Sequence, residues 1–260
     1  MTENTRFPAI FLSHGAPLLA IETGPAHDFL RDLGRTLGHP NAILVVSAHW
    51  EERAPRVSTA QQPDTIYDFR GFPEALYRLS YPAPGAPGLA QRAATLLSGA
   101  DIDIQFDPHR GLDHGAWVPL MLMYPQADIP VTQLSVQTHL GTEHHFRLCE
   151  ALRPLRDEAV LILGSGSATH NLPAIAFGSP ARQAPAWVTE FQDWVAQAVE
   201  RGNSAELLDY RLAAPHAQRN HPTEEHFLPL FVALGAGERG RRIHRSHTYG
   251  LLAMDVYRFD

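Results

Sequence analysis

Three histidines each follow closely after a short apolar run. His14 ends "AIFLSH", His49 ends "ILVVSAH", and His170 follows "VLILGSGSAT". Short apolar runs bounded by turn residues are typical of buried strands. Histidine is both a neutral ligand for transition metals and a proton carrier near neutral pH. Because ligands of an open parallel sheet bind where its strands end, we expect these three imidazoles to meet at one edge.

Each of these histidines, taken alone, is also compatible with an ordinary strand-end residue whose hydrogen bonds are satisfied. Three on different strand ends favour a shared site instead. Small residues lie beside two of them, Gly15 and Ala16 in the first segment and Gly164 to Ala168 in the third. We expect these small residues to leave room for a ligand.

The segment "NHPTEEHFLPL" carries two more histidines, His221 and His226. Pro222 suits the first turn of a helix, and the two glutamates that follow suit the positive end of its dipole. We therefore predict a helix over Glu224–Leu234 with His226 in its early turns. His221 would lie at the cap near the surface, although a place in the site stays open for it.

In "GLDHGAWVPL", the neighbours Asp113 and His114 resemble a loop that enters a helix. His114 could form a hydrogen bond behind the site or contact a substrate, whereas Asp113 could equally cap the helix. Solvated positions are expected for the other histidines, which are His27, His39, His109, His139, His144, His145, His216, His244 and His247.

Apolar runs and helical patterns alternate along the chain. This alternation indicates βαβ units around a mainly parallel sheet, and the continuous apolar runs indicate strands covered on both faces. The predicted strands are Phe7–Leu12, Ala42–Ser47, Ile129–Val136 and Val160–Gly164, with weaker candidates at Arg56–Ala60, Ile102–Phe106 and Leu251–Val256. The predicted helices are Pro25–Leu37, Pro87–Leu97, Trp117–Met123, His144–Leu155, Trp187–Glu200 and Glu224–Leu234.

Composition limits the function classes. The 260 residues, 44% hydrophobic and 19% charged, predict one domain over residues 1–260 with a sizeable core. A net charge of −7 argues against a nucleic-acid partner, and Gly237–Arg245, which is rich in arginine, is expected to be a solvated loop. We find neither a signal peptide nor an apolar run of about 18 residues, which argues against a membrane protein and favours a cytoplasmic one. The single cysteine, Cys149, is expected in the core of a helix.

Several common motifs are missing. "GSGSAT" is neither a dinucleotide-binding GxGxxG nor a phosphate-binding loop with its lysine, and it is not the GxSxG of a nucleophile elbow. The chain has no HExxH and, with one cysteine, no paired CxxC. The histidines are therefore the main candidates for chemistry.

The motifs "FLSHGAP", "VVSAHW", "DHGAWVPL", "ATHNL" and "PTEEHFLPL", in this order, resemble those of the class III extradiol ring-cleavage dioxygenases. The stretch "IYDFRGFPEALYRLSYPAPGAP" is similar to the 4,5-DOPA dioxygenase type within that class, so that the resemblance covers nearly the whole chain. It implies a single-domain, three-layer α/β/α fold with one mononuclear metal. It also implies cleavage of a catechol-type ring by O2 to a ring-opened semialdehyde.

The resemblance also implies roles for individual residues. His14, His49 and His226 would be the metal ligands, and His170 would be the acid/base histidine or a fourth ligand in a resting form. His114 would face the substrate. Fe(II) would support activity, but three imidazoles also suit Zn(II), which could occupy the isolated protein. Tyr67 and Trp117 are candidates for orienting the ring of the catechol, and the chain would be a monomer or a homodimer.

Two other functions remain open at this point. A zinc-dependent hydrolase could use the same histidines to activate water, although only Glu225 is at hand as a base. The other is a non-catalytic metal-binding or sensor protein; a sensor would need a partner surface or an added domain, and the sequence indicates neither.

Overall fold

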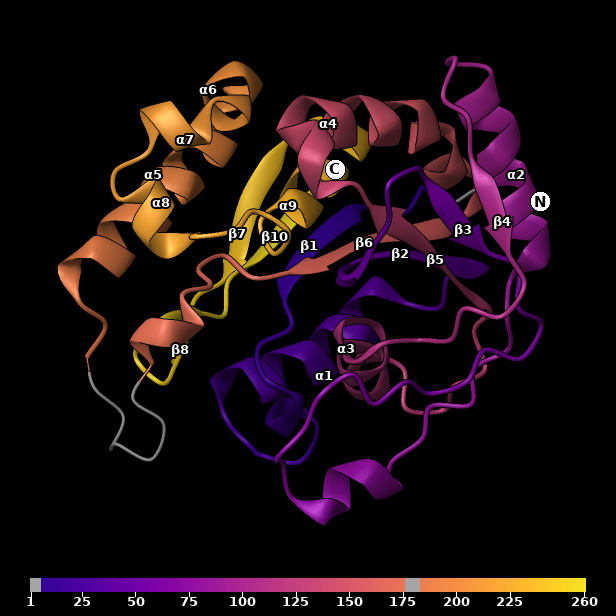
Figure 1. Ribbon diagram of the computed structural model, residues 1–260, viewed down its shortest axis with the longest axis horizontal. Coiled ribbons are helices and arrows are strands. Elements are labelled where there is room, and N and C mark those ends of the chain that lie inside the picture. The colour runs from indigo at the N-terminus through magenta and orange to yellow at the C-terminus, as the bar shows by residue number, and fades with distance from the viewer. Residues whose placement is uncertain (1–5, 176–182) are drawn as a thin grey trace.

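An eight-stranded sheet in the order β4-β3-β5-β2-β6-β1-β10-β7 forms the centre of the protein (Figure 1). The computed structural model describes residues 6–175 and 183–260. The strands of this sheet are β1 (Ala9–Ser13), β2 (Ala42–Glu51), β3 (Arg56–Ser58), β4 (Gln105–Asp107), β5 (Val131–Val136), β6 (Val160–Gly166), β7 (Gly240–His244) and β10 (Val256–Phe259). The neighbours β5, β2, β6 and β1 are parallel, whereas β10 pairs antiparallel with both β1 and β7.

Helices cover both faces of this sheet. The longer helices are α1 (Pro25–Leu37), α2 (Pro87–Ser98), α3 (His114–Met123), α4 (Gly141–Leu152), α5 (Ala186–Arg201) and α9 (Leu228–Ala236). In Figure 1, α1 and α3 lie below the sheet, and α2 and α4 lie above it. Three short helices, α6 (Ser204–Leu208), α7 (Tyr210–Ala213) and α8 (Ala217–Asn220), lie beside α5. Among the described residues, no helix is long and apolar enough to cross a membrane.

Alternating side chains of the central strands divide the core into two parts. In β1, Ala9 and Phe11 pack with α4, α5 and α9, whereas Ile10 and Leu12 pack with α1 and α3. All four side chains are fully buried, as expected for strands that are covered on both faces. The prediction of a three-layer α/β/α fold with a mainly parallel sheet is therefore confirmed. Cys149 is buried in α4 as expected.

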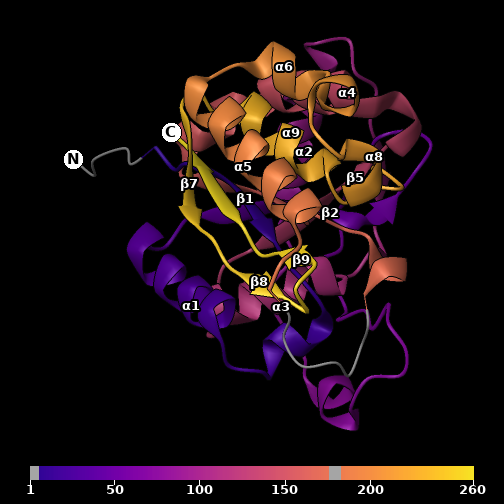
Figure 2. The same cartoon turned by 90° about the vertical axis from the view of Figure 1, so that its left-hand side faces the viewer.

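A short antiparallel hairpin lies outside the main sheet. Its strands are β8 (His247–Thr248) and β9 (Leu252–Ala253). Figure 2 shows this hairpin below α5, toward the end of the molecule that contains α1 and α3. The weak strand prediction at Leu251–Val256 therefore spans two elements, because β9 ends before β10 begins.

Two predictions about the C-terminal region are wrong. The arginine-rich segment forms the edge strand β7, whose Arg242 pairs with the buried Asp255 at 3.3 Å. An edge strand tolerates charged side chains because one side of it faces solvent. The last long helix begins at Leu228 rather than Glu224, and His226 lies in the turn before it.

Candidate active site

His14, His49 and His226 meet at the carboxyl end of the parallel strands. His14 follows the last residue of β1, and its backbone N–H donates to the carbonyl of Gly166 at the end of β6 (2.9 Å). His49 lies within β2, just past Ser47, the last residue of β2 that pairs with β6. Strand positions thus direct two of the imidazoles, and the turn before α9 supplies the third.

The three imidazoles direct the same nitrogen toward one another. The Nε2 atom of His49 lies 3.1 Å from Nε2 of His14 and 3.2 Å from Nε2 of His226. Two nitrogens that each lie about 2.1 Å from one ion, at a right angle, are about 3.0 Å apart. This spacing therefore fits three ligands on one face of a single metal ion.

Hydrogen bonds at Nδ1 decide which nitrogen carries the proton. Ser165 donates its only hydroxyl proton to the carbonyl of Gly115, so that its oxygen accepts from Nδ1 of His14 at 2.9 Å. The Nδ1 atom of His226 donates to the carboxylate of Glu225, also at 2.9 Å. Both rings therefore keep the Nε2 lone pair free, as a metal ligand requires.

The protonation state of the cluster also fits a metal. Burial, followed by the neighbouring histidines, holds the pKa of His14 and His226 well below the ordinary range of histidine. Burial and the charge of His114 lower the pKa of His49 to about 4, against the opposing pull of Asp113 and Asp68. All three imidazoles are therefore neutral at pH 7. Neutral lone pairs held this close repel one another, and a cation between them removes that repulsion.

Asp68 connects His49 to His114. Its Oδ2 lies 2.9 Å from Nδ1 of His114 and 3.3 Å from Nδ1 of His49, and its Oδ1 accepts the backbone N–H of His114. Burial opposes ionisation of Asp68, but hydrogen bonds and charge from His114 outweigh it and lower the pKa to about 2. No sequence pattern indicated these contacts, because Asp68 lies in a loop and not at a strand end.

His170 stacks on one of the three converging histidines. The ring centroids of His170 and His226 are 3.4 Å apart, with an angle of 11° between the planes. Its backbone N–H donates to the carbonyl of Asn220, and its side chain is half-buried at the cavity. Burial lowers the pKa of His170 to about 4, so the ring is neutral at pH 7 and can accept a proton.

Asp113 does not cap α3 with its side chain, although it occupies the N-cap position. Its carboxylate accepts hydrogen bonds from Ser47 (2.6 Å), Gln133 (2.8 Å) and Arg110 (2.6 Å). The hydroxyl of Ser47 in turn accepts the backbone N–H of His49. Asp113 therefore ties the loop before α3 to β2 and β5, close to His49.

The glycines of β6 leave room for backbone, not for a ligand. A Cβ atom on Gly164 would lie 2.1 Å from the carbonyl oxygen of Pro229, and one on Gly166 would lie 2.1 Å from that of His226. The expectation that they make space for a ligand is wrong for these two positions. They let the turn that carries His226, and the first residues of α9 after it, lie directly on the strand.

Two histidines expected near solvent are buried. His221 is fully buried, and its Nε2 donates to the carbonyl of Ala168 at 2.9 Å, which holds the loop before His170. His145 is 1% exposed; its Nδ1 donates to the carbonyl of Gly141, and its Nε2 accepts the N–H of Gln137. In both cases, backbone groups provide partners that the sequence pattern did not reveal.

The converging histidines border a cavity of about 190 Å³. Tyr67 and Trp117, the predicted ring-orienting residues, are absent from its described lining, and each donates to a backbone carbonyl elsewhere. Phe69 and Phe72 line the cavity instead. The described lining contains no carboxylate and consists of His14, Gly15, Ala16, Pro17, His49, Phe69, Phe72, His114, Ser167, His170, Leu172, His226, Tyr249 and Leu252.

Known proteins share this sequence and this fold. A "4,5-DOPA dioxygenase extradiol" of Beta vulgaris is 48% identical over 96% of this chain and 95% of its own. A protein with the same name from Escherichia coli K12 is 41% identical over 90% of this chain and 86% of its own. A crystal structure of an uncharacterized protein from Escherichia coli K12 has a TM-score of 0.84 and 35% identity, covering 98% of this chain and 100% of that one.

One family accounts for almost the whole chain. Residues 8–259 match the family described as the catalytic LigB subunit of aromatic ring-opening dioxygenases. The three histidines that could hold one metal ion lie within the matched region. The chain therefore belongs to the LigB family of aromatic ring-opening dioxygenases and is an extradiol dioxygenase.

Proposed function

We propose that the protein cleaves a catechol-type ring, that of DOPA or a related catechol, with O2 and Fe(II), and that the product is a ring-opened semialdehyde. One observation carries this proposal: the Nε2 atoms of three histidines converge beside an aromatic-lined cavity that has no carboxylate among its described residues. Nε2 of His49 lies 3.1 Å from that of His14 and 3.2 Å from that of His226. His14, His49 and His226 would be the ligands. Fe(II) supplies open positions for the two catechol oxygens and for O2, and it lets electrons pass from the ring to O2.

The protein's own groups would move the protons. His170 is neutral at pH 7 and lines the cavity, and we assign to it the acceptance of a catechol hydroxyl proton and the return of a proton later in the reaction. His114 donates its Nδ1 proton to Asp68, so that its Nε2 is free to accept a hydrogen bond from a catechol hydroxyl. Phe69 and Phe72 would pack against the ring and keep water out.

The hydrolase alternative lacks its base. Glu225 accepts the Nδ1 proton of His226 and the hydroxyl proton of Thr223, and it is absent from the described lining of the cavity. A carboxylate in this position orients a ligand and does not activate water in the cavity. The site can still bind Zn(II), so metal content alone does not identify the reaction.

Oxygen consumption after anaerobic reconstitution with Fe(II) tests the proposal. With a panel of catechols, we expect equimolar loss of O2 and catechol and a new yellow chromophore. A protein that holds one iron per chain but consumes no O2 with any catechol would contradict the proposal.

Two variants separate metal binding from proton transfer. We expect His49→Ala to lose iron, because a ligand is removed. We expect His170→Ala to keep iron and to lose kcat by roughly 10²- to 10⁴-fold, as is typical when an acid/base group is removed. Loss of iron in His170→Ala would instead make His170 a fourth ligand.

A further inference from the structure

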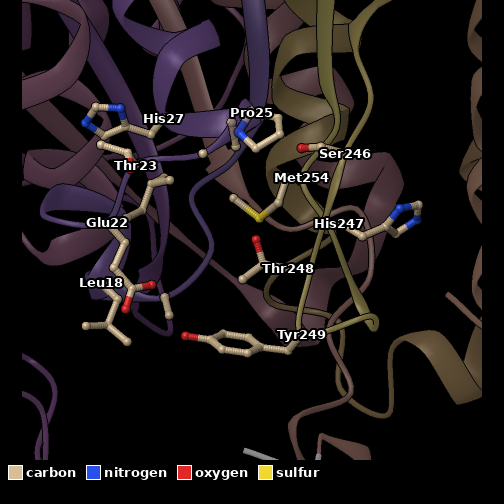
Figure 3. A pocket seen from close by; sticks show the side chains of 14 residues that line it. Leu18, Glu22, Thr23, Pro25, His27, Ser246, His247, Thr248, Tyr249 and Met254 are labelled. Atoms are coloured by element: carbon tan, nitrogen blue, oxygen red, sulfur yellow. The ribbon is translucent and has the colours of Figure 1, made fainter. Parts of the chain in front are cut away.

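A second cavity, about 360 Å³ in volume, lies beside the first. Figure 3 shows the side chains that line it. One wall comes from the segment between β1 and α1 and from the start of α1; the other comes from the segment around β8 and from Met254. Its described lining consists of Ala16, Leu18, Leu19, Glu22, Thr23, Gly24, Pro25, Ala26, His27, Ser246, His247, Thr248, Tyr249 and Met254.

The two cavities share part of their walls. Ala16 and Tyr249 line both of them. Ala16 follows His14 by two residues, so this shared wall begins next to a predicted metal ligand. A catechol held by its two oxygens near the histidines therefore has a neighbouring space for a substituent on the far side of its ring.

The second cavity carries a negative charge. Among the described residues of its lining, Glu22 is the only acidic one, and there is neither lysine nor arginine. Among the residues that the structure describes, Glu22 has no ion pair, whereas Nδ1 of the neighbouring His27 lies 3.1 Å from Asp28. An unpaired carboxylate in a wall without lysine or arginine among its described residues attracts a cation.

Tyr249 adds a polar group beside this carboxylate. In Figure 3, its ring extends along one side of the cavity with the hydroxyl directed toward the side of Glu22. Burial and the charge of Glu22 raise the pKa of Tyr249, so the hydroxyl remains protonated. The rest of the wall includes the apolar side chains of Leu18 and Met254, which suit a short alkyl chain.

We propose that this second cavity binds a positively charged substituent of the catechol substrate, such as an alkylammonium group, with Glu22 as its counter-ion. This inference rests on the proposed function, since it places the ring of the substrate at the histidines. It makes Glu22 a specificity-determining residue, and it makes the apolar wall the contact for the alkyl chain that joins the ring to the ammonium group.

Three catechols that differ in the charge of their substituent test the inference. Dopamine carries an ammonium group, 3-(3,4-dihydroxyphenyl)propionate carries a carboxylate, and 4-ethylcatechol is neutral. In Glu22→Gln we expect the ratio of kcat/KM for dopamine to that for 4-ethylcatechol to fall about fivefold, which is the size of an exposed ion pair. The change should lie mainly in KM, because the pair forms equally in the ground state and the transition state.

Charge reversal and salt give independent checks. We expect Glu22→Lys to have a higher kcat/KM for the propionate than for dopamine, the reverse of the order in the unmodified protein. Raising the ionic strength should lower the dopamine preference of the unmodified protein but not that of Glu22→Gln, because the carboxylate is exposed and screened. Asp32→Asn is the matched control: this exposed carboxylate on α1 pairs with Arg35, outside both cavities, and its loss should leave the ratio unchanged.

The outcomes separate this inference from the proposed function. Turnover of 4-ethylcatechol by the unmodified protein tests ring cleavage alone. Two results in Glu22→Gln would overturn the role of Glu22. One is an unchanged ratio of kcat/KM for dopamine to that for 4-ethylcatechol, and the other is an equal loss of kcat/KM for all three catechols. Calorimetric titration of dopamine into the anaerobic Fe(II) protein and into Glu22→Gln measures the same contact without turnover, and equal affinities would also overturn it.

Discussion

At the residue scale, a hydrogen-bonding or charged partner at Nδ1 orients each of the three converging histidines. The chemical types of His14, His49 and His226 are readable in the sequence, because each stands out beside apolar residues. Their partners Ser165 and Asp68 are not, because a hydroxyl or carboxylate becomes a hydrogen-bond acceptor for an imidazole only when the fold brings the two together. The residues that fix the proton on each ring are therefore visible only in three dimensions.

Asp68→Asn tests this dependence. The neutral amide loses the charge that attracts the Nδ1 protons of His49 and His114, and we expect metal affinity to fall roughly 10- to 100-fold. Competition with a chromophoric chelator measures this affinity directly. Asp64→Asn, an exposed position in the same loop, is the control and should retain the affinity of the unmodified protein. Equal affinity in Asp68→Asn would show that the ligands are oriented without this carboxylate.

At the element scale, the sequence identified the buried central strands and α1 correctly, because continuous apolar runs and helical spacing are local signals. The start of α9 was not predictable in the same way. Pro222 and the acidic residues after it suit a helix, yet the chain forms a turn there. That turn lies on the glycines of β6, since the carbonyl of His226 accepts the N–H of Ser167 at 2.8 Å. A tertiary contact thus overrides a local preference.

Gly166→Ala tests the contact between β6 and this turn. The added Cβ would lie 2.1 Å from the carbonyl of His226, so that either the strand or the turn must shift. We expect a loss of about 1–3 kcal/mol in the free energy of unfolding, measured in urea, together with weaker metal binding. Gly88→Ala in α2 is the control, because its Cβ would meet nothing within 4 Å. A stable variant with unchanged metal affinity would mean that the close approach does not position His226.

At the scale of the whole molecule, burial of many imidazoles makes stability depend on pH. Burial is the first cause of the lowered pKa at the buried or half-buried histidines His14, His49, His145, His170, His221 and His226. The unfolded chain, in which these groups have ordinary pKa values near 6.5, binds protons first as the pH falls. Acid therefore favours the unfolded state.

His145 isolates this effect, because it lies in α4, outside the described lining of the cavity beside His14, His49 and His226. Burial lowers its pKa from 6.5 to about 4, with an opposing hydrogen bond to Gly141. The stabilising contribution is complete above pH 6.5 and is lost as the pH falls from 6.5 toward 4, by roughly 3 kcal/mol in total.

In His145→Asn, which has no proton to bind, the free energy of unfolding should therefore fall less steeply between pH 7 and pH 5. Urea titrations across this range compare the slopes, so that any loss of stability common to all pH values cancels. An equally steep slope in His145→Asn would place the acid sensitivity at other histidines.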